Sequence, residues 1–211
     1  MTVHARIAQG IRSVGHRLVR APLRMLPPAA VVPIMSGPAA GRRWVVGSAT
    51  HGCWLGSYER DKQVRFAEDA ARATVVFDIG ANVGFYTLVA ATRPGRPAVF
   101  AFEPLPRNVQ FLHRHASING LDNVTIVEAA VADTVGTARF DPGPHASMGH
   151  LDGGGSLAVR STTIDALVLD EQLPMPDLIK IDVEGAELQV LTGADRVVRH
   201  RRPILYVATH A

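Results

Sequence analysis

"VVFDIGANVGFYTLVAA", residues 75–91, reads as a buried strand, a glycine turn and an apolar helix in direct succession. The run Val75–Ile79 is apolar except for Asp78, which stands where the strand should end. Gly80 and Gly84 lie four residues apart, so the backbone can turn tightly and a ligand can approach it closely. The stretch predicts a ligand-binding loop at the carboxyl end of a strand, with a carboxylate beside it.

Strands that read as apolar runs alternate with amphipathic helices from residue 74 onward. The expected strands are residues 75–79, 98–103, 123–131, 177–185 and 202–209, and the expected helices are residues 83–92, 107–120 and 186–199. Residues 137–140 and 157–164 are expected to pair as a short hairpin. Continuous apolar strands belong to parallel sheets that helices cover on both faces. The sequence therefore predicts an α/β fold with a ligand site at the carboxyl ends of the strands, near the point where strand order reverses.

The bulk composition suits one soluble globular domain with a proper core, since the 211 residues are 47% hydrophobic and 19% charged. No apolar run reaches the roughly 18 residues that a membrane-spanning helix needs. The single cysteine, Cys53, excludes an internal disulfide framework and a cysteine-based zinc cluster. It also fits a reducing compartment, so we expect a cytoplasmic protein.

The charge is distributed unevenly along the chain. Residues 1–58 contain seven arginines and no Asp or Glu, whereas the remaining 15 of the 22 Lys and Arg residues face all 19 Asp and Glu residues. The basic excess belongs to the N-terminal segment and not to the core, which argues against a nucleic-acid groove over the core. We expect no nucleic-acid partner.

The N-terminal segment carries apolar residues at helical spacing over residues 1–26, with arginines mostly elsewhere on the helix. Three interpretations stay open: a helix docked on the core or on a second subunit, a basic helix resting on an anionic membrane surface, and an organelle transit peptide. Residues 27–41 read as an irregular linker rich in Pro, Gly and Ala. We therefore expect the helix and linker in residues 1–41, a strand and helix that lead into the core in residues 42–72, and the core in residues 73–211.

The loop after the first core strand has the spacing G-x-x-x-G, whereas a pyrophosphate loop has three glycines spaced G-x-G-x-x-G. The carboxylate of Asp78 would repel pyrophosphate and suits a cation or an ammonium group. Glu103 ends the next strand and can accept hydrogen bonds from both hydroxyls of a ribose. A ribose with a cationic partner and no phosphate describes S-adenosylmethionine. A nucleotide-dependent oxidoreductase and a glycine turn without a ligand remain the alternatives.

Four stretches together carry a resemblance to a known family: "FDIGANVGFYTL", "AFEPLPRNVQFLHRHASINGLDNV", "STTIDAL" and "PDLIKIDVEGAELQVLTGA". In this order and spacing the sequence resembles the FkbM-type methyltransferases, a class I S-adenosylmethionine-dependent group, over roughly Trp44 to Ala211. The resemblance implies a Rossmann-like sheet with helices on both faces. It also implies methyl transfer to a hydroxyl oxygen of a small-molecule or glycan acceptor, such as a sugar, a glycan or a related natural product.

The resemblance also implies roles for individual residues. Carried over position by position, it assigns the methionine side of the cofactor to Asp78, Gly80, Ala81, Asn82 and Gly84. Glu103 would hold the ribose, and Asn108 on the following helix would help to position that segment. Asp133 would lie near the adenine, although it also reads as a solvated turn residue before a glycine.

The polar residues around the fourth core strand are the candidate catalytic group. Lys180 and Asp182 are two residues apart, so they point to the same side of the strand and form either the polar centre of the active site or a structural ion pair. Glu184 joins them at the start of a helix, where a carboxylate also complements the helix dipole. Methyl transfer requires removal of the acceptor's proton, and Asp182 and His210 are the two candidate bases. Metal assistance from Asp182 and Glu184 stays an open alternative, but their spacing matches no specific metal signature, so we assign no metal ligand.

The end of the sequence departs from the family pattern. Ala208 stands where family members usually carry an acidic residue. The further helix and antiparallel hairpin of the usual methyltransferase sheet are expected to be missing, which would leave the last strand as an exposed edge. A homo-oligomer that covers this edge is one expectation. The alternative function is a truncated or degenerate protein that binds S-adenosylmethionine or supports an assembly without catalysis.

Overall fold

The structure is a computed structural model and describes residues 26–141, 150–151 and 154–209. The basic helix expected in residues 1–26 lies outside this range apart from Leu26, and so does the candidate base His210. The expectations for both stay predictions.

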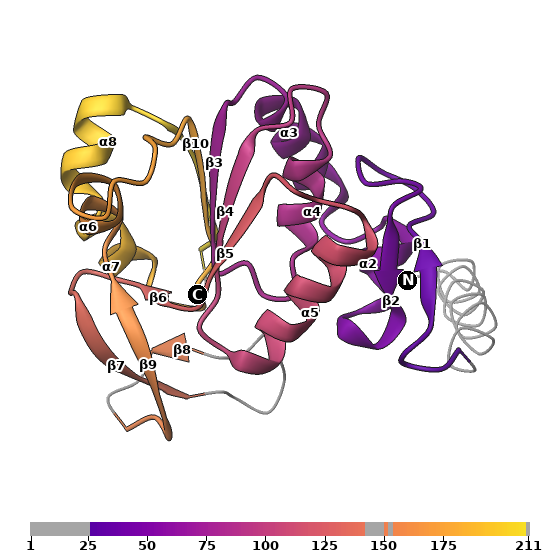
Figure 1. Cartoon of the computed structure of the whole chain (residues 1–211), viewed down its shortest axis with the longest axis horizontal. Helices are drawn as coiled ribbons and strands as arrows, with labels where there is room; N and C mark the ends of the chain where they lie inside the picture. Colours follow the sequence, from indigo (N-terminus) through magenta and orange to yellow (C-terminus); the bar gives the residue numbers. More distant parts are fainter. Residues whose placement is uncertain (1–25, 142–149, 152–153, 210–211) are drawn as a thin grey trace, which may run out of the picture.

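A five-stranded parallel sheet forms the centre of the molecule (Figure 1). Its strands, in spatial order, are β11 (Ile204–Val207), β10 (Leu178–Ile181), β3 (Val75–Ile79), β4 (Ala98–Phe102) and β5 (Val124–Val127). The chain runs outward from β3 through β4 to β5 and then returns to the other side of β3 with β10. Strand order therefore reverses between β3 and β10. The predicted Rossmann-like α/β fold is confirmed.

Helices cover both faces of this sheet (Figure 1). One face carries α3 (Arg60–Ala70), α4 (Phe85–Ala91) and α5 (Pro106–Ile118), and the other carries α6 (Ile164–Leu169), α7 (Glu187–Thr192) and α8 (Asp195–Arg201). Alternate residues of a strand point to opposite faces, so β3 sends Val76 into the first layer and Phe77 into the second. Burial on both sides explains why Asp78 is the only polar residue of β3.

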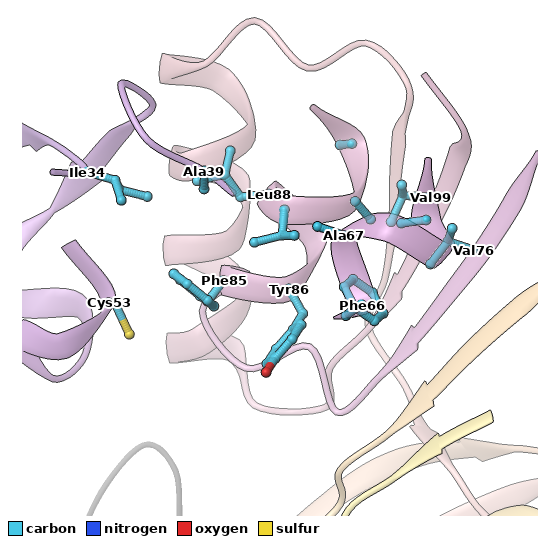
Figure 2. Close-up of a cluster of buried hydrophobic side chains, with 14 of the residues drawn as sticks. Ile34, Ala39, Cys53, Phe66, Ala67, Val76, Phe85, Tyr86, Leu88 and Val99 are labelled. Atoms are coloured by element: carbon cyan, nitrogen blue, oxygen red, sulfur yellow. The ribbon is translucent and has the colours of Figure 1, made fainter. Parts of the chain in front are cut away.

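One of the two apolar layers extends into the N-terminal part of the chain. Figure 2 shows Ile34 and Cys53 on the same side of the cluster as Phe85 of α4. The ring of Tyr86 lies at the border of this cluster, with its hydroxyl pointing away from the labelled apolar side chains (Figure 2). That hydroxyl donates a hydrogen bond to Oε2 of Glu59 at 2.6 Å. Tyr86 therefore links the apolar core to the carboxylate of Glu59.

Residues 26–72, which we call the lead-in segment, pack on α4 and α5 through this layer. The strand and the helix expected in residues 42–72 are confirmed by β2 (Arg43–Val45) and α3. A short 3-10 turn, η1 (Val46–Ser48), and α2 (His51–Leu55) connect them.

The linker expected in residues 27–41 is wrong in part. β1 (Val31–Pro33) pairs antiparallel with β2, and the side chain of Ile34 is only 2% exposed. The prolines and glycines predict turns, but they do not reveal that the apolar residues between them have a core to pack on. Burial of these residues outweighs the local preference for irregular structure.

A second, four-stranded sheet follows β5. Its order is β6 (Ala130–Val131), β9 (Leu157–Thr162), β7 (Gly136–Asp141) and β8 (His150–Leu151). The expected hairpin is confirmed by the antiparallel pairing of β7 with β9. The strand expected over residues 123–131 is split into β5 and β6. The pairing of β5 with β4 ends at Val127, and β6 pairs with β9 of the second sheet instead.

β11 pairs only with β10 within the described residues and so forms an edge of the central sheet there. Ile204 and Leu205 are 45% and 37% exposed on it. The second subunit expected to cover this edge stays a prediction. Among the helices that the structure describes, none has the length and hydropathy of a transmembrane helix.

His115 of α5 ties the lead-in segment to the loop after β3. The N–H of Val45 donates to Nε2 of His115 at 3.1 Å, so Nδ1 carries the ring proton and donates to the carbonyl oxygen of Val83 at 2.7 Å. The ring stacks on Trp44, with 3.9 Å between centroids. Burial lowers the pKa of His115 to about 4. The neutral imidazole is therefore the form that the fold requires.

Stability should fall as the pH drops from about 6.5 to about 4, because His115 takes up its proton in the unfolded chain before it does so in the folded one. The loss from this residue should be about 3 kcal/mol, the energy equivalent of the shift. His115→Gln keeps one donor and one acceptor without titrating. Urea unfolding at pH 7 and pH 4 should show a smaller loss in the variant, and equal losses would contradict this role.

Candidate active site

A pocket with a volume of about 860 Å³ opens at the carboxyl ends of β3, β4, β10 and β11. Its wall includes the loop between β3 and α4, the residues that follow β4, β5 and β10, and the lead-in segment. The predicted site residues that line it are Gly80, Ala81, Asn82, Glu103, Asn108, Lys180, Asp182 and Glu184. The fold thus brings most of the predicted site together where strand order reverses.

The loop between β3 and α4 requires glycine at two positions. Gly80 has a φ of +71°, and a Cβ there would lie 2.0 Å from the carbonyl oxygen of Asp182. Gly84 has a φ of +94°, and a Cβ there would lie 2.3 Å from Cδ1 of Leu112. A side chain at either position would push the loop away from β10 or from α5. Gly84 therefore shapes the loop from outside the pocket lining.

Glu103 is held in a fixed orientation at the end of β4. Its Oε1 accepts from the N–H of Leu105 at 3.0 Å and from Nδ2 of Asn108 at 3.1 Å, and its Oε2 accepts from the N–H of Asn82 at 2.8 Å. Burial raises the pKa of Glu103 above its ordinary value, although these hydrogen bonds favour the carboxylate. A carboxylate has about four acceptor directions, so a ligand hydroxyl can still bond to it. The predicted role of Asn108, to position this segment, agrees with these contacts.

Asn82, in the same loop, has a backbone conformation that is unusual for a residue other than glycine. Its φ is +52°, in the left-handed region that non-glycine residues rarely occupy. Its Oδ1 is buried and has no hydrogen-bond partner among the residues that the structure describes. Buried polar atoms are nearly always paired, so this acceptor indicates a donor supplied by a ligand or by water.

Asp78 lies beneath the pocket and not in its lining. It faces Lys180 directly across the pairing of β3 with β10, and the Lys180 Nζ to Asp78 Oδ1 distance is 3.3 Å. The hydroxyl of Thr87 donates to its other oxygen at 2.7 Å. Asp78 is fully buried. The structure therefore places the predicted partner of the ligand's cation in contact with a cation of the protein.

Lys180 joins Asp78 to the pocket. Its Nζ lies 3.4 Å from Oδ2 of Asp182 and donates to the carbonyl oxygen of Gly80 at 3.4 Å. Burial alone would lower the pKa of Lys180, but the carboxylates of Asp78 and Asp182 outweigh it and the pKa is raised. The ammonium group therefore stays charged, and Lys180 acts as a fixed cation and not as a base.

Asp182 and Glu184 carry carboxylates on the pocket wall after β10. Glu184 has a φ of +53°, a second strained position in the lining. The neighbouring Glu187 accepts hydrogen bonds from the N–H groups of Val183 and Gly185 at 3.1 Å each and so closes the turn before α7. Glu187 has a capping role, whereas Asp182 and Glu184 face the pocket.

Asp133, the predicted neighbour of the adenine, is exposed and does not line the pocket. In this stretch of the chain, the residues that line the pocket are Ala129, Ala130 and Val131. The chain turns into the second sheet through β6 at this point, which carries Asp133 past the pocket. The turn interpretation of Asp133 agrees with this position.

The lead-in segment supplies pocket residues that the sequence did not single out. Tyr58, Glu59 and Lys62 line the pocket, together with Tyr86 of α4. Burial raises the pKa of Tyr58 and of Tyr86 above the ordinary range, and the adjacent Glu59 adds to both shifts. In the sequence these residues belong to the charged run "YERDK" at the start of an expected helix. Nothing in that run distinguishes pocket residues from an ordinary solvent-exposed helix start.

Within the part of the chain that the structure describes, no group of three His, Cys, Asp or Glu side chains could hold a metal ion. Chemically, the arrangement offers fixed acceptors for hydroxyls at Glu103, carboxylates next to charged amines at Asp182, and a close-fitting glycine loop. It suits a ligand that bears a ribose and a positive charge.

Lys180→Met should destabilise the fold by about 3–5 kcal/mol, because it leaves the carboxylate of Asp78 buried without its cation. The double variant Asp78→Asn, Lys180→Met should recover most of that loss. Urea unfolding of the wild type, both single variants and the double variant measures the coupling. Additive effects in the double variant would mean that the pair does not act as a unit.

Two curated proteins are similar to this chain. A hexuronic acid methyltransferase, AglP of Haloferax volcanii, is 31% identical and is covered over 56% of its length, against 64% of this chain. The methyltransferase sdnD of Sordaria araneosa is 26% identical and is covered over 60% of its length, against 57% of this chain. The chain therefore spans between half and two thirds of the length of these relatives.

Solved structures give weaker similarities. An FkbM methyltransferase from Methylobacillus flagellatus superposes with a TM-score of 0.48 at 19% identity, over 76% of this chain and 44% of that one. The putative methyltransferase yhhF from Escherichia coli gives a TM-score of 0.48 at 13% identity, over 84% and 80% of the two chains.

The model of the methyltransferase FkbM domain matches residues 78–211, which begin at Asp78 and include Glu103, Lys180 and Asp182. The resemblance seen in the sequence motifs is thereby confirmed, and both curated relatives carry the name of a methyltransferase. Because the match covers more than half of the 211 residues, the chain belongs to the FkbM family of methyltransferases.

Proposed function

We propose that the protein transfers a methyl group from S-adenosylmethionine to a hydroxyl oxygen of a sugar, a glycan or a related natural product. The observation that carries this proposal is the composition of one pocket. It holds the fixed carboxylate of Glu103 at the end of β4 and the Lys180–Asp182 pair at the end of β10. The first suits a ribose, and the second suits an acceptor whose proton must be removed.

The residues present fit S-adenosylmethionine. Glu103 would hold the ribose hydroxyls. The buried Oδ1 of Asn82 has no donor among the described residues, and a ligand could supply one. Gly80 lines the pocket, and the close approach of the Asp182 carbonyl leaves no room for a side chain there. When bound, S-adenosylmethionine supplies an activated methyl group.

The protein's own groups would orient the acceptor and take its proton. A neutral alcohol is a poor nucleophile, so a base within hydrogen-bond reach of the hydroxyl should matter. Asp182 is in position for this task, because it lines the pocket while Lys180 fixes it from below. Lys180 stays protonated and so offers a permanent positive charge beside the base. His210 stays the second candidate base.

Two observations support the proposed acceptor class: the polar side chains of the pocket wall and the name of a related protein. Hydrogen-bonding carboxylates and amines line the wall around Asp182, as polyhydroxylated acceptors require. The relative from Haloferax volcanii is named for hexuronic acid, which is a sugar acid with several hydroxyls. We therefore propose a carbohydrate hydroxyl as the acceptor, free or within a glycan.

Methyl transfer to an acceptor panel tests the function. Purified protein with methyl-labelled S-adenosylmethionine should label a neutral or an acidic hexose glycoside and should produce S-adenosylhomocysteine in equal amount. Labelling that is absent with every acceptor, in a protein that binds the cofactor, would favour the non-catalytic alternative. A folded protein that binds no cofactor would contradict the proposal.

Asp182→Asn should lower the rate of transfer by about 10²–10⁴-fold, because it removes the base but keeps the shape of the side chain. Affinity for S-adenosylhomocysteine should fall much less than the rate does. Rate measurements across pH 6–9, with binding measured beside them, separate the two effects. If Asp182→Asn keeps full activity while His210→Ala loses it, the base is His210.

A further inference from the structure

The burial of Asp78 leaves a question about the charged end of the cofactor. S-adenosylmethionine ends in an amino acid group with one ammonium and one carboxylate, and these need partners of opposite charge. Asp78 is covered and already paired with Lys180 and Thr87. The partners must therefore be sought among the charged residues that line the pocket.

Glu59 and Lys62 are an ion pair on that lining. Nζ of Lys62 lies 3.3 Å from Oε1 of Glu59, and Oε2 of Glu59 accepts from the hydroxyl of Tyr86 at 2.6 Å. Lys62 Nζ also lies 4.0 Å from Oδ2 of Asp182. The side chains of Glu59 and Lys62 are 34% and 28% exposed, so both can meet a ligand.

The position of this pair is next to the glycine loop. Tyr86 follows Gly84 by two residues, and its ring lies 5.5 Å from Nζ of Lys62 and 5.2 Å from Nζ of Lys180. Lys180 in turn contacts the carbonyl oxygen of Gly80. The pair is therefore close to the loop assigned to the methionine side of the cofactor, while Glu103 and Asn108 belong to the ribose side.

The backbone at Glu59 is strained and held in place. Its φ and ψ are 42° and 47°, in the left-handed region. The side chain of Gln63 is fully buried and donates to the carbonyl oxygens of Gly56 at 3.2 Å and of Tyr58 at 2.8 Å. Asn82 and Glu184 are two more strained residues of the same lining. Strain of this kind persists where the surroundings fix a functional side chain.

The charges of this wall suit a ligand with a positive end. Among the described residues that line this wall, Glu59, Asp182 and Glu184 are acidic, whereas Lys62 and Lys180 are basic. Lys180 is already paired with Asp78. The acidic excess favours an ammonium and a sulfonium, and Lys62 offers a cation for one carboxylate. A zwitterionic end with an adjacent positive sulfur matches this pattern.

We propose that Glu59 and Lys62 bind the amino acid end of S-adenosylmethionine, with Glu59 facing its ammonium group and Lys62 its carboxylate. The assignment rests on the proposed cofactor. It gives the lead-in segment, which precedes the residues that the family model matches, a direct part in the cofactor site.

Two ligands that differ only at this end test the assignment. S-adenosylhomocysteine carries the amino acid end, whereas 5′-methylthioadenosine keeps the adenosine and the sulfur but lacks that end. Titration calorimetry with the full chain measures the affinity of each ligand for the wild type and for Glu59→Gln and Lys62→Gln. Both variants should bind S-adenosylhomocysteine about 10–100-fold more weakly, because each loses one charge-assisted contact. Their affinity for 5′-methylthioadenosine should stay within about twofold.

Two controls complete the experiment. Glu68→Gln removes an exposed carboxylate of α3 away from the pocket and should change neither affinity. Glu103→Ala should weaken both ligands, because both carry the ribose. Melting temperatures show whether each variant is folded.

The outcomes separate the two proposals. If the wild type binds both ligands and the Glu59 and Lys62 variants weaken both alike or neither, the assignment is overturned and the cofactor site stands. If the folded wild type binds neither ligand, the proposed cofactor fails and this assignment fails with it. Selective loss of S-adenosylhomocysteine supports the assignment.

Discussion

The ammonium group of Lys180 faces the carboxylate of Asp78 across two strands that lie about a hundred residues apart in the sequence. Neither charge could stay in the core alone, because an unpaired buried ion is strongly destabilising. The pair fixes the ends of β3 and β10 side by side, and the same ammonium group contacts the carbonyl oxygen of Gly80. The floor of the pocket and the conformation of its glycine loop both depend on this contact.

Charges of alternating sign continue from that floor to the rim of the pocket. The order is Asp78, Lys180, Asp182, Lys62 and Glu59, with neighbouring charged atoms 3.3–4.0 Å apart. Each cation is thus shared between two carboxylates, so the position of each group depends on the next. This row joins the core sheet to the lead-in segment. The pocket becomes complete only when the lead-in segment packs on α4.

The sequence predicted the parts of the site that follow from local patterns. The apolar run before Gly80 defined a strand end, and the two-residue spacing of Lys180 and Asp182 put both on one side of β10. It did not reveal that Asp78 is buried, because this depends on the register between distant strands. It also did not reveal that Asp133 lies outside the pocket lining, because the chain changes sheets after Val127, which β propensity does not encode.

The most direct test of the central claim, that this pocket holds S-adenosylmethionine, is a crystal structure of the chain with S-adenosylhomocysteine. We predict that the ribose hydroxyls contact the carboxylate of Glu103 and that the sulfur lies on the side of Asp182. Ligand density outside this pocket, or a ribose that does not contact Glu103, would contradict it.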